Sequence, residues 1–179
     1  MPKILENPRE KILIEAKVIL KENGYEALSM RKLAKNCDIG IGTVYNYFKN
    51  KYSIATEIVR LDWSTAINDL DKIKILEIPF EDKMRRIYDE LNNYLANHID
   101  IFLDLYKEEK TKPDHCSEDI LGPLYSVVDE MIDYHRERGE LNINLETSKF
   151  SKFIITNMVT IVKSNAFSFE DLMVVLTHK

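Results

Sequence analysis

Glycine and proline are scarce in this chain, with 5 of each among 179 residues. β-Sandwiches and barrels need many tight turns, which use these two residue types, so their scarcity disfavours such folds. Apolar residues make up 45% of the chain and charged residues 31%, which is enough for a core and too apolar for a disordered chain. The composition therefore predicts long helices, in one compact domain or two small ones sharing a core.

Long uncharged stretches are also missing. The longest, residues 39–48 and 153–162, span 10 positions each, whereas a membrane helix needs about twenty. The N-terminus carries charges from its first residues and has no apolar signal core. We therefore expect no transmembrane segment and a cytoplasmic location. The 2 cysteines, Cys37 and Cys116, fit no metal or redox spacing, and we expect Cys37 to be a reduced, buried thiol.

Motifs of the common enzyme classes are absent from the sequence. It has no phosphate-binding glycine loop, no His-Glu-x-x-His, no nucleophile elbow and no Rossmann fingerprint. The 4 histidines, at positions 98, 115, 135 and 178, define no catalytic constellation. Asp114, His115 and Cys116 are adjacent metal-ligand types, but no fourth ligand follows at a useful spacing. The sequence thus predicts neither an enzyme nor a metal or cofactor.

Charge is distributed unevenly along the chain. Residues 1–53 hold 10 Lys and Arg against 6 Asp and Glu, net +4, although the whole chain has a net charge of −5. A basic segment on an acidic body suggests a head that binds a polyanion. We therefore divide the chain into a predicted head, residues 1–53, and a predicted body, residues 54–179.

Helix-start and helix-stop signals recur through the head. Asn7, Pro8 and Glu10 predict a capped helix start, and Gly24 a left-handed stop. Ser29 and Asn50 are the expected caps of later helices, and the four helices are predicted at residues 8–23, 30–36, 41–47 and 51–73. Two short helices joined by about four residues are helix-turn-helix geometry, whose second helix fits the DNA major groove.

The helix predicted at 41–47 has one apolar and one polar side. Val44 and Phe48 are expected in the core. The polar side offers hydroxyl, amide and aromatic groups, followed by two phosphate-seeking lysines: Thr43, Tyr45, Asn46, Tyr47, Lys49 and Lys51. Alternatively, the two tyrosines pack between helices. The nearby Lys32 and Lys35 either contact phosphate or are solvated charges on the surface of their helix.

The segment LSMRKLAKNCDIGIGTVYNYFKNK, residues 28–51, resembles the DNA-binding signature of the tetracycline-repressor-like (TetR) regulators of bacteria. The resemblance covers about residues 8–60. It implies an all-α protein of about nine helices, with a three-helix helix-turn-helix head and a C-terminal helical bundle. It also implies phosphate contacts from Thr43, Tyr47 and Lys51, and base-edge contacts from Ile41, Gly42, Tyr45, Asn46 and, toward a guanine, Arg31. Ser29 and Lys49 complete the predicted DNA-binding set.

Three positions depart from the family pattern. Asp38 stands where the family commonly has Gly, although Asp tolerates the left-handed conformation better than most residues. Gly40 replaces the usual Ser cap, which costs only a few tenths of a kcal/mol. Ile41 replaces a frequently polar residue and suits a thymine methyl group better than a hydrogen bond.

Helices are also expected through the body, at residues 79–97, 101–109, 144–165 and 168–178. Between the second and third of these, a loop at residues 111–117 is followed by a long helix that reaches residue 138. Pro123 either marks the first turn of this long helix or kinks it, and Gly139 ends it. Ser168 and Asp171 form a capping-box-like start for the last.

The last two predicted helices are apolar on more than one face. We predict a homodimer seam that includes Phe150, Phe153, Ile154, Asn157, Ile161, Leu172, Val175 and Leu176. The resemblance implies an isologous four-helix seam, and its two-fold symmetry suits a pseudo-palindromic operator. The alternative is a helix that is merely central in a monomer.

Aromatic and methionine residues are frequent in residues 63–134 and are candidate effector ligands, since small-molecule pockets are mostly apolar. They are Trp63, Met84, Tyr88, Tyr94, His98, Phe102, Tyr106, Tyr125, Met131 and Tyr134, each of which is alternatively ordinary core or surface. We therefore predict a DNA-binding transcriptional regulator, a repressor released by a small apolar or aromatic effector. The alternatives are an effector-independent architectural or cell-division DNA-binding protein, and a protein-interaction module without DNA affinity.

Overall fold

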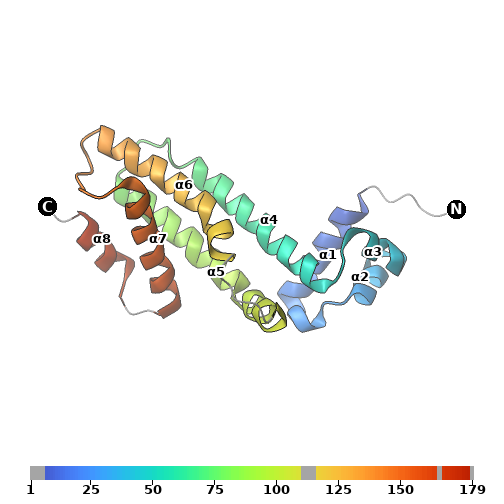
Figure 1. The fold of residues 1–179 in the computed structure, drawn as a ribbon. Coiled ribbons are helices and arrows are strands. Elements are labelled where there is room, and N and C mark those ends of the chain that lie inside the picture. The colour runs from blue at the N-terminus through green and yellow to red at the C-terminus, as the bar shows by residue number, and fades with distance from the viewer. Residues whose placement is uncertain (1–6, 110–115, 165–166, 178–179) are drawn as a thin grey trace. The chain divides into compact units, whose positions relative to one another are not determined.

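The computed structural model describes residues 7–109, 116–164 and 167–177. In these ranges it has eight α-helices, one 3-10 helix and no strand, which confirms the all-α prediction (Figure 1). The elements are α1 (Pro8–Asn23), η1 (Tyr25–Ala27), α2 (Met30–Cys37), α3 (Ile41–Tyr47), α4 (Lys51–Asp71), α5 (Phe80–Glu109), α6 (Cys116–Glu137), α7 (Thr147–Ser164) and α8 (Phe169–Thr177). None of these described helices is both long and apolar enough to cross a membrane.

The chain forms two compact units. The head unit comprises residues 1–62 and 98–111, and the body unit comprises residues 63–97 and 112–179. The division therefore falls inside α4, nine residues beyond the boundary predicted after residue 53, and it assigns the C-terminal part of α5 to the head. The reason is apolar packing, because Leu105 is buried in the head core and Ile101 packs against it.

Several helix ends form as predicted. The Ser29 hydroxyl accepts a hydrogen bond from the Lys32 amide at 3.2 Å. Asn50 caps α4, since its Oδ1 accepts from the Ser53 amide at 2.8 Å. Ser168 caps α8, with its hydroxyl 3.0 Å from the Asp171 amide while Asp171 accepts from the Ser168 amide at 2.8 Å. These side chains satisfy amides that a helix N-terminus leaves without intrahelical partners.

Positive φ angles mark the predicted stops. Gly24 has φ 75° after α1, and Gly139 has φ 70° after α6. Without a Cβ, glycine adopts these angles at no steric cost. Asp38 follows α2 with φ 55° and ψ 48°, the left-handed conformation expected for it. The chain therefore turns at the places where the sequence predicts that its helices end.

Three boundary predictions are wrong. Residues 101–109 are not a separate helix, because α5 runs unbroken for 30 residues without an internal Gly or Pro. Asn7 does not cap α1, since its backbone is left-handed and its side-chain amide donates instead to Glu10 Oε2 at 2.7 Å. α7 begins at Thr147 rather than at 144. Before it, the Arg136 guanidinium binds the carbonyl oxygens of Ile143 and Leu145 and holds that loop out of the helix.

Pro123 lies inside α6, at its eighth residue, rather than in its first turn. A proline there has no N–H to continue the helical hydrogen-bond ladder. The sequence left both positions open, and the structure selects the internal one.

The head core is built mainly from α1, α2, α3 and the first half of α4. Val44 and Phe48 are buried in it, as predicted. Cys37 is fully buried, with its Sγ 3.7 Å from the Lys11 carbonyl oxygen. Burial raises the pKa of the Cys37 thiol, with a smaller effect in the same direction from Glu15. The thiol is thus a small core group held in its protonated form.

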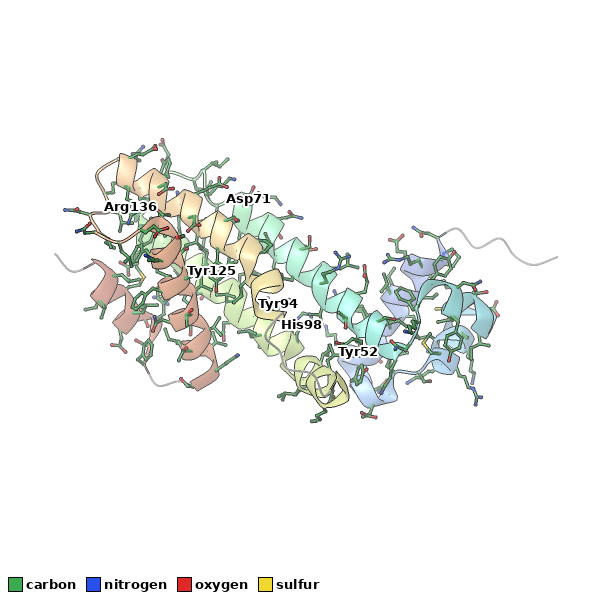
Figure 2. The ribbon with its side chains drawn as sticks, in the orientation of Figure 1. Tyr52, Asp71, Tyr94, His98, Tyr125 and Arg136 are labelled. Carbon is green, nitrogen blue, oxygen red and sulfur yellow. The ribbon has the colours of Figure 1, made fainter. Side chains whose placement is uncertain are left out.

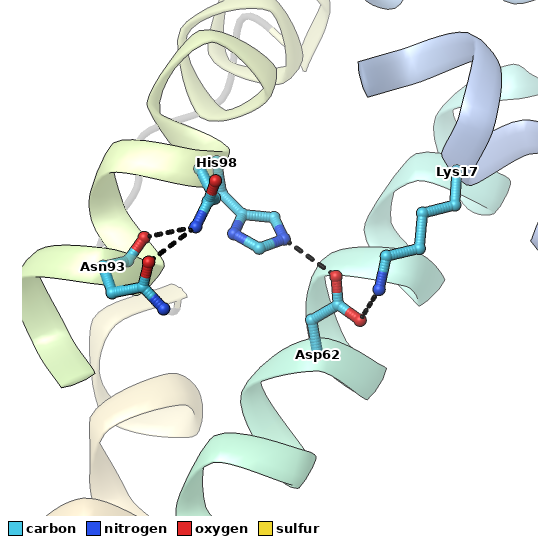
Figure 3. Close-up of polar contacts among 5 residues, drawn as sticks. Lys17, Asp62, Asn93 and His98 are labelled. Atoms are coloured by element: carbon cyan, nitrogen blue, oxygen red, sulfur yellow. Dashed lines mark hydrogen bonds and ion pairs between the residues drawn. The ribbon is translucent and has the colours of Figure 1, made fainter. Parts of the chain in front are cut away.

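A polar link inside the head joins three helices (Figure 3). Asp62 on α4 lies between Lys17 on α1 and His98 on α5. The Lys17 ammonium is 2.5 Å from Asp62 Oδ1, and His98 Nε2 is 3.0 Å from Asp62 Oδ2. His98 is buried, as the apolar pattern around it indicated. Its polar edge is therefore satisfied by a carboxylate that comes from a different helix.

The body encloses an unusual pair of buried basic side chains. Lys83 is fully buried, its ammonium donates to the Lys74 carbonyl at 2.8 Å, and burial lowers its pKa. His135 is also buried, with Nδ1 2.6 Å from Glu140 Oε2. Burial lowers the pKa of His135, and Glu140 acts in the opposite direction without reversing it. Its Nε2 has no hydrogen-bond partner among the described residues.

Candidate nucleic-acid interface

The turn between α2 and α3 is held by one backbone and one side-chain contact. The Ile39 amide donates to the Ala34 carbonyl at 3.0 Å, which closes the end of α2 around Asp38. Lys11, from α1, donates its ammonium to the Cys37 carbonyl at 2.7 Å. A cation at a helix C-terminus satisfies its last carbonyls and opposes the negative end of the dipole. These contacts fix the direction in which α3 leaves the turn.

The outward face of α3 carries the four residues predicted to meet base edges and Tyr47, predicted to contact phosphate. Tyr45 is 53% exposed, Tyr47 44% and Ile41 41%, and Gly42 and Asn46 are also exposed. The two tyrosines therefore do not pack between helices, which removes that alternative. Val44 is the buried residue of this seven-residue helix. The exposed side chains leave α3 with a surface suited to reaching into a groove.

The remaining predicted DNA-contacting residues differ in how freely their side chains are presented. Arg31 and Lys49 are exposed, and Thr43 is half-buried. Lys51 is also half-buried, and its ammonium lies 4.1 Å from the centre of the Tyr25 ring and 3.8 Å from Glu26 Oε2. The Ser29 hydroxyl is engaged in capping α2. Lys32 is half-buried and Lys35 exposed.

Sequence reasoning missed Tyr25 and Glu26, which lie in η1. They touch Lys51 from 25 to 26 positions away in the chain, and no periodic pattern connects them. It also missed Arg9, whose guanidinium lies 5.5 Å from the centre of the Phe48 ring and 2.9 Å from Glu57 Oε1. Arg9 thus ties α1 to α4 beside the end of α3.

Residues 12–58 match the family model described as bacterial regulatory proteins, tetR family. The matched segment contains the turn and all of α2 and α3. Residues 12–58 are therefore a TetR-family DNA-binding domain. This domain places the helix-turn-helix, α2 and α3, in the head unit.

Two curated regulators are similar to this chain in sequence. The HTH-type transcriptional regulator SAB2452 of Staphylococcus aureus is 36% identical over 66 residues, which are 37% of this chain and 36% of the relative. The chain therefore spans about a third of that protein's length. The HTH-type transcriptional regulator UidR of Escherichia coli is 23% identical over 151 residues, 82% of this chain and 76% of UidR.

Two solved structures share the fold over nearly the whole chain. Salmonella enterica GusR aligns with a TM-score of 0.72 at 15% identity, covering 99% of this chain and 100% of GusR. Thermus thermophilus FadR, a TetR-family transcriptional repressor in complex with lauroyl-CoA, aligns with a TM-score of 0.62 at 14% identity, covering 94% and 93%. At these identities the likeness concerns the fold alone.

The predicted effector residues are divided between the two units. In the body, Trp63 and Tyr94 are buried with ring centres 4.6 Å apart, and Met84 and Met131 are also buried. Tyr88, Tyr125 and Tyr134 are half-buried; Tyr94 and Tyr125 belong to α5 and α6 (Figure 2). His98 lies in the head unit, bound to Asp62. The side chains of Phe102 and Tyr106 lie outside the described residues.

The body has a recess of about 380 Å³, open to solvent, lined by Arg85, Tyr88, Ile161, Phe167, Ser168, Phe169 and Glu170. Of these lining residues, Tyr88 was predicted to bind an effector and Ile161 to lie in the dimer seam; the other five belong to neither set. Arg85 pairs with Glu170 at 2.6 Å and lies 3.9 Å from the centre of the Phe169 ring. The guanidinium is thus already neutralised by a carboxylate of the same chain.

The eight residues predicted for a dimer seam fall into two groups. Phe150, Ile154, Ile161, Leu172 and Leu176 are buried within the protomer itself. Phe153 is 45% exposed and Val175 72%, and Asn157 is half-buried. Val174, which was not predicted, is 52% exposed on α8. Of the eight predicted residues, only Phe153, Asn157 and Val175 therefore offer side-chain surface to a partner.

The described residues contain no group of three or more His, Cys, Asp or Glu that could hold a metal ion. Asp114 and His115 lie outside the described residues, as does the Cys116 side chain.

Proposed function

We propose that this regulator is a homodimeric repressor that binds a pseudo-palindromic operator and is released from it by a small apolar or aromatic effector. The observation that carries the DNA-binding half is the amphipathic recognition helix, α3. Its inner side holds Val44 in the core while Tyr45, Asn46 and Tyr47 stand in solvent. Aromatic, amide and hydroxyl groups on an exposed helix of this length match the chemistry of major-groove readout.

In this proposal the contacts divide by role. Thr43, Tyr47 and Lys51 bind phosphates, with Ser29 and Lys49 beside them, and position the head on the duplex. Asn46, Tyr45 and Arg31 read base edges. Gly42 permits close approach, and a Cβ added there would meet no atom of the chain within 4 Å. Ile41, with 41% of its surface exposed, contacts a thymine methyl group.

A dimer supports two-fold symmetric DNA binding. Phe153 on α7 and Val174 and Val175 on α8 are exposed apolar side chains on two helices that contact each other. Such a surface on both protomers forms an isologous interface. Lys149, Lys152 and Lys163 are exposed on α7, while Glu170 and Asp171 are exposed on α8.

The effector half rests on the body's composition and on one structural neighbour. Trp63, Tyr94, Met84 and Met131 are apolar and aromatic groups gathered in the body core. The neighbouring Thermus thermophilus FadR is in complex with lauroyl-CoA, whose acyl chain is apolar. An effector releases DNA only by the difference between its affinities for the two conformations, commonly 1 to 3 kcal/mol of coupling free energy.

The operator is identified by selecting bound sequences from random duplex DNA with the full chain. A salt titration with the selected site then tests the phosphate contacts. The slope of log affinity against log salt counts phosphates neutralised by cations, so Lys49 and Lys51 in both protomers predict a slope of about −4. Lys51→Ala makes the slope shallower, while Lys21→Ala, at an exposed position on α1 outside the predicted set, leaves it unchanged. A flat salt response of the wild-type chain contradicts the proposal.

The same DNA-binding assay, repeated with apolar compounds added, separates the rival functions. An effector-independent architectural or cell-division protein binds DNA with the same salt dependence, but no apolar compound releases it. A pure protein-interaction module selects no sequence at all.

A further inference from the structure

Lys51 is the least accessible of the cations assigned to phosphate. Its side chain is 27% exposed, and the buried Tyr25 ring lies directly against its ammonium, 4.1 Å from ring centre to Nζ. A cation held over an aromatic face loses much of its freedom to move. Lys51 is also the first residue of α4, directly after the Asn50 cap. Its ammonium therefore has a defined place at the DNA-facing end of that helix.

A carboxylate of the same chain already faces this ammonium. Glu26 Oε2 lies 3.8 Å from Lys51 Nζ, and the Glu26 side chain is 87% exposed. An ion pair this exposed contributes little to folding, because water screens it and two long side chains lose freedom to form it. Its electrostatic effect on a third charge is different. A DNA phosphate that approaches Lys51 meets the negative charge of Glu26 at nearly the same distance.

We propose that Glu26 is an affinity-setting residue, whose carboxylate competes with DNA phosphate for Lys51. The inference rests on the proposed role of Lys51 in DNA binding. Without DNA, Glu26 neutralises the held ammonium. When DNA binds, a phosphate replaces Glu26 beside Lys51 and the displaced carboxylate stays within a few Å of it. The competition lowers affinity for every DNA sequence by the same factor, because phosphates carry no sequence information.

The size of the effect follows from Coulomb's law. Two unit charges about 4 Å apart in water change an equilibrium by about fivefold. Glu26→Gln should therefore strengthen DNA binding by about fivefold for each head, or about 25-fold for a dimer that uses both. Salt screens an exposed charge, so the gain shrinks as salt rises toward 0.5 M.

The test measures fluorescence anisotropy of the full-length chain with two duplexes, the selected operator and a scrambled sequence of equal length. Glu26→Gln is compared with Glu22→Gln, which removes the same charge from an exposed position at the end of α1. Lys107 also senses Glu26 but is paired with Asp104 at 2.8 Å. The decisive background is therefore Lys51→Met, which removes the ammonium for which Glu26 competes.

We expect Glu26→Gln to bind both duplexes more tightly by one common factor, well above any gain from Glu22→Gln. In the Lys51→Met background the extra gain should disappear. A gain no larger than that of Glu22→Gln, or one that persists in Lys51→Met, overturns the inference while leaving DNA binding intact. Failure of the wild-type chain to bind either duplex instead overturns the proposed function. Circular dichroism of each variant confirms that the exposed substitution leaves the helices folded.

Discussion

His98 and Asp62 are 36 positions apart and in contact, with His98 Nε2 3.0 Å from Asp62 Oδ2. The other oxygen of the same carboxylate receives Lys17 at 2.5 Å. One side chain thus joins α1, α4 and the last third of α5 within the head unit. This contact explains why a segment so late in the chain belongs to the DNA-binding unit, together with the burial of Leu105 in the same core.

Replacing Asp62 tests that joint. Asp62→Ala leaves the buried His98 without its carboxylate, and loss of a partner for a buried polar group costs about 1 to 3 kcal/mol of unfolding free energy. The control is Asp69→Ala on the same helix, where the carboxylate pairs with exposed Lys72. Denaturant titrations followed by circular dichroism measure both. If both variants lose the same small amount of unfolding free energy, the Asp62 contact contributes no more to stability than an exposed ion pair.

Base recognition and phosphate binding should separate by mutation. Asn46→Ala and Arg31→Ala are expected to lower affinity for the operator by about 1 to 3 kcal/mol and to relax preference at particular base pairs. The reason is that both exposed side chains carry several hydrogen-bond donors suited to base edges. Lys51→Ala should weaken all sequences alike. Repeating the random-DNA selection with each variant measures the change, and an unaltered consensus for Asn46→Ala contradicts its assignment.

The assembly prediction concerns the exposed apolar side chains of α7 and α8. Phe153→Glu places a charge in the proposed seam, which a desolvated apolar interface does not tolerate. We expect the wild-type chain to sediment as a dimer at micromolar concentration and the variant as a monomer. Ile75→Glu is the matched control, since Ile75 is 73% exposed in the segment between α4 and α5. A wild-type monomer would refute the seam and, with it, the palindromic operator.

Acid should weaken the body through His135. Burial lowers the pKa of His135 in the folded chain, whereas the unfolded side chain binds a proton near pH 6.5. The unfolded state therefore holds more protons below that pH, and the unfolding free energy falls as the pH drops. His135→Phe removes the titration, so its melting temperature should change less than that of wild type between pH 7.5 and 5.5. A thermal melt series measures this, and parallel curves would contradict the assignment.

Effector binding can be followed through the single tryptophan. Trp63 is 5% exposed and packs on Tyr94, so a ligand that enters the body core changes its emission. Titration with long-chain acyl-CoA, neutral aromatics and flat hydrophobic cations should quench it, and a true inducer releases DNA over the same concentrations. Trp63→Phe controls for inner-filter effects. A ligand that quenches without releasing DNA binds both conformations equally and is no inducer.

Local signals were sufficient to predict the helix-turn-helix of the head. Helix periodicity, the Ser29 and Asn50 caps and the positive-φ turn at Asp38 depend on residues within a few positions of one another. The motif of residues 28–51 then identified the family. After residue 53, local patterns indicated the helices but also a false break before residue 101. They could not show that His98 and Leu105 pack into the head unit.

Only the tertiary structure decided which distant residues lie beside one another. Periodicity shows that α7 is apolar on more than one face, but it cannot show what covers each face. The fold buries Phe150 and Ile154 within the protomer and leaves Phe153 in solvent. Likewise, the sequence marks Lys51 as a cation, while the packing of η1 against α4 sets Tyr25 and Glu26 beside it. Sequence patterns report the preferences of neighbours along the chain, whereas burial and charge pairing depend on which segments meet in space.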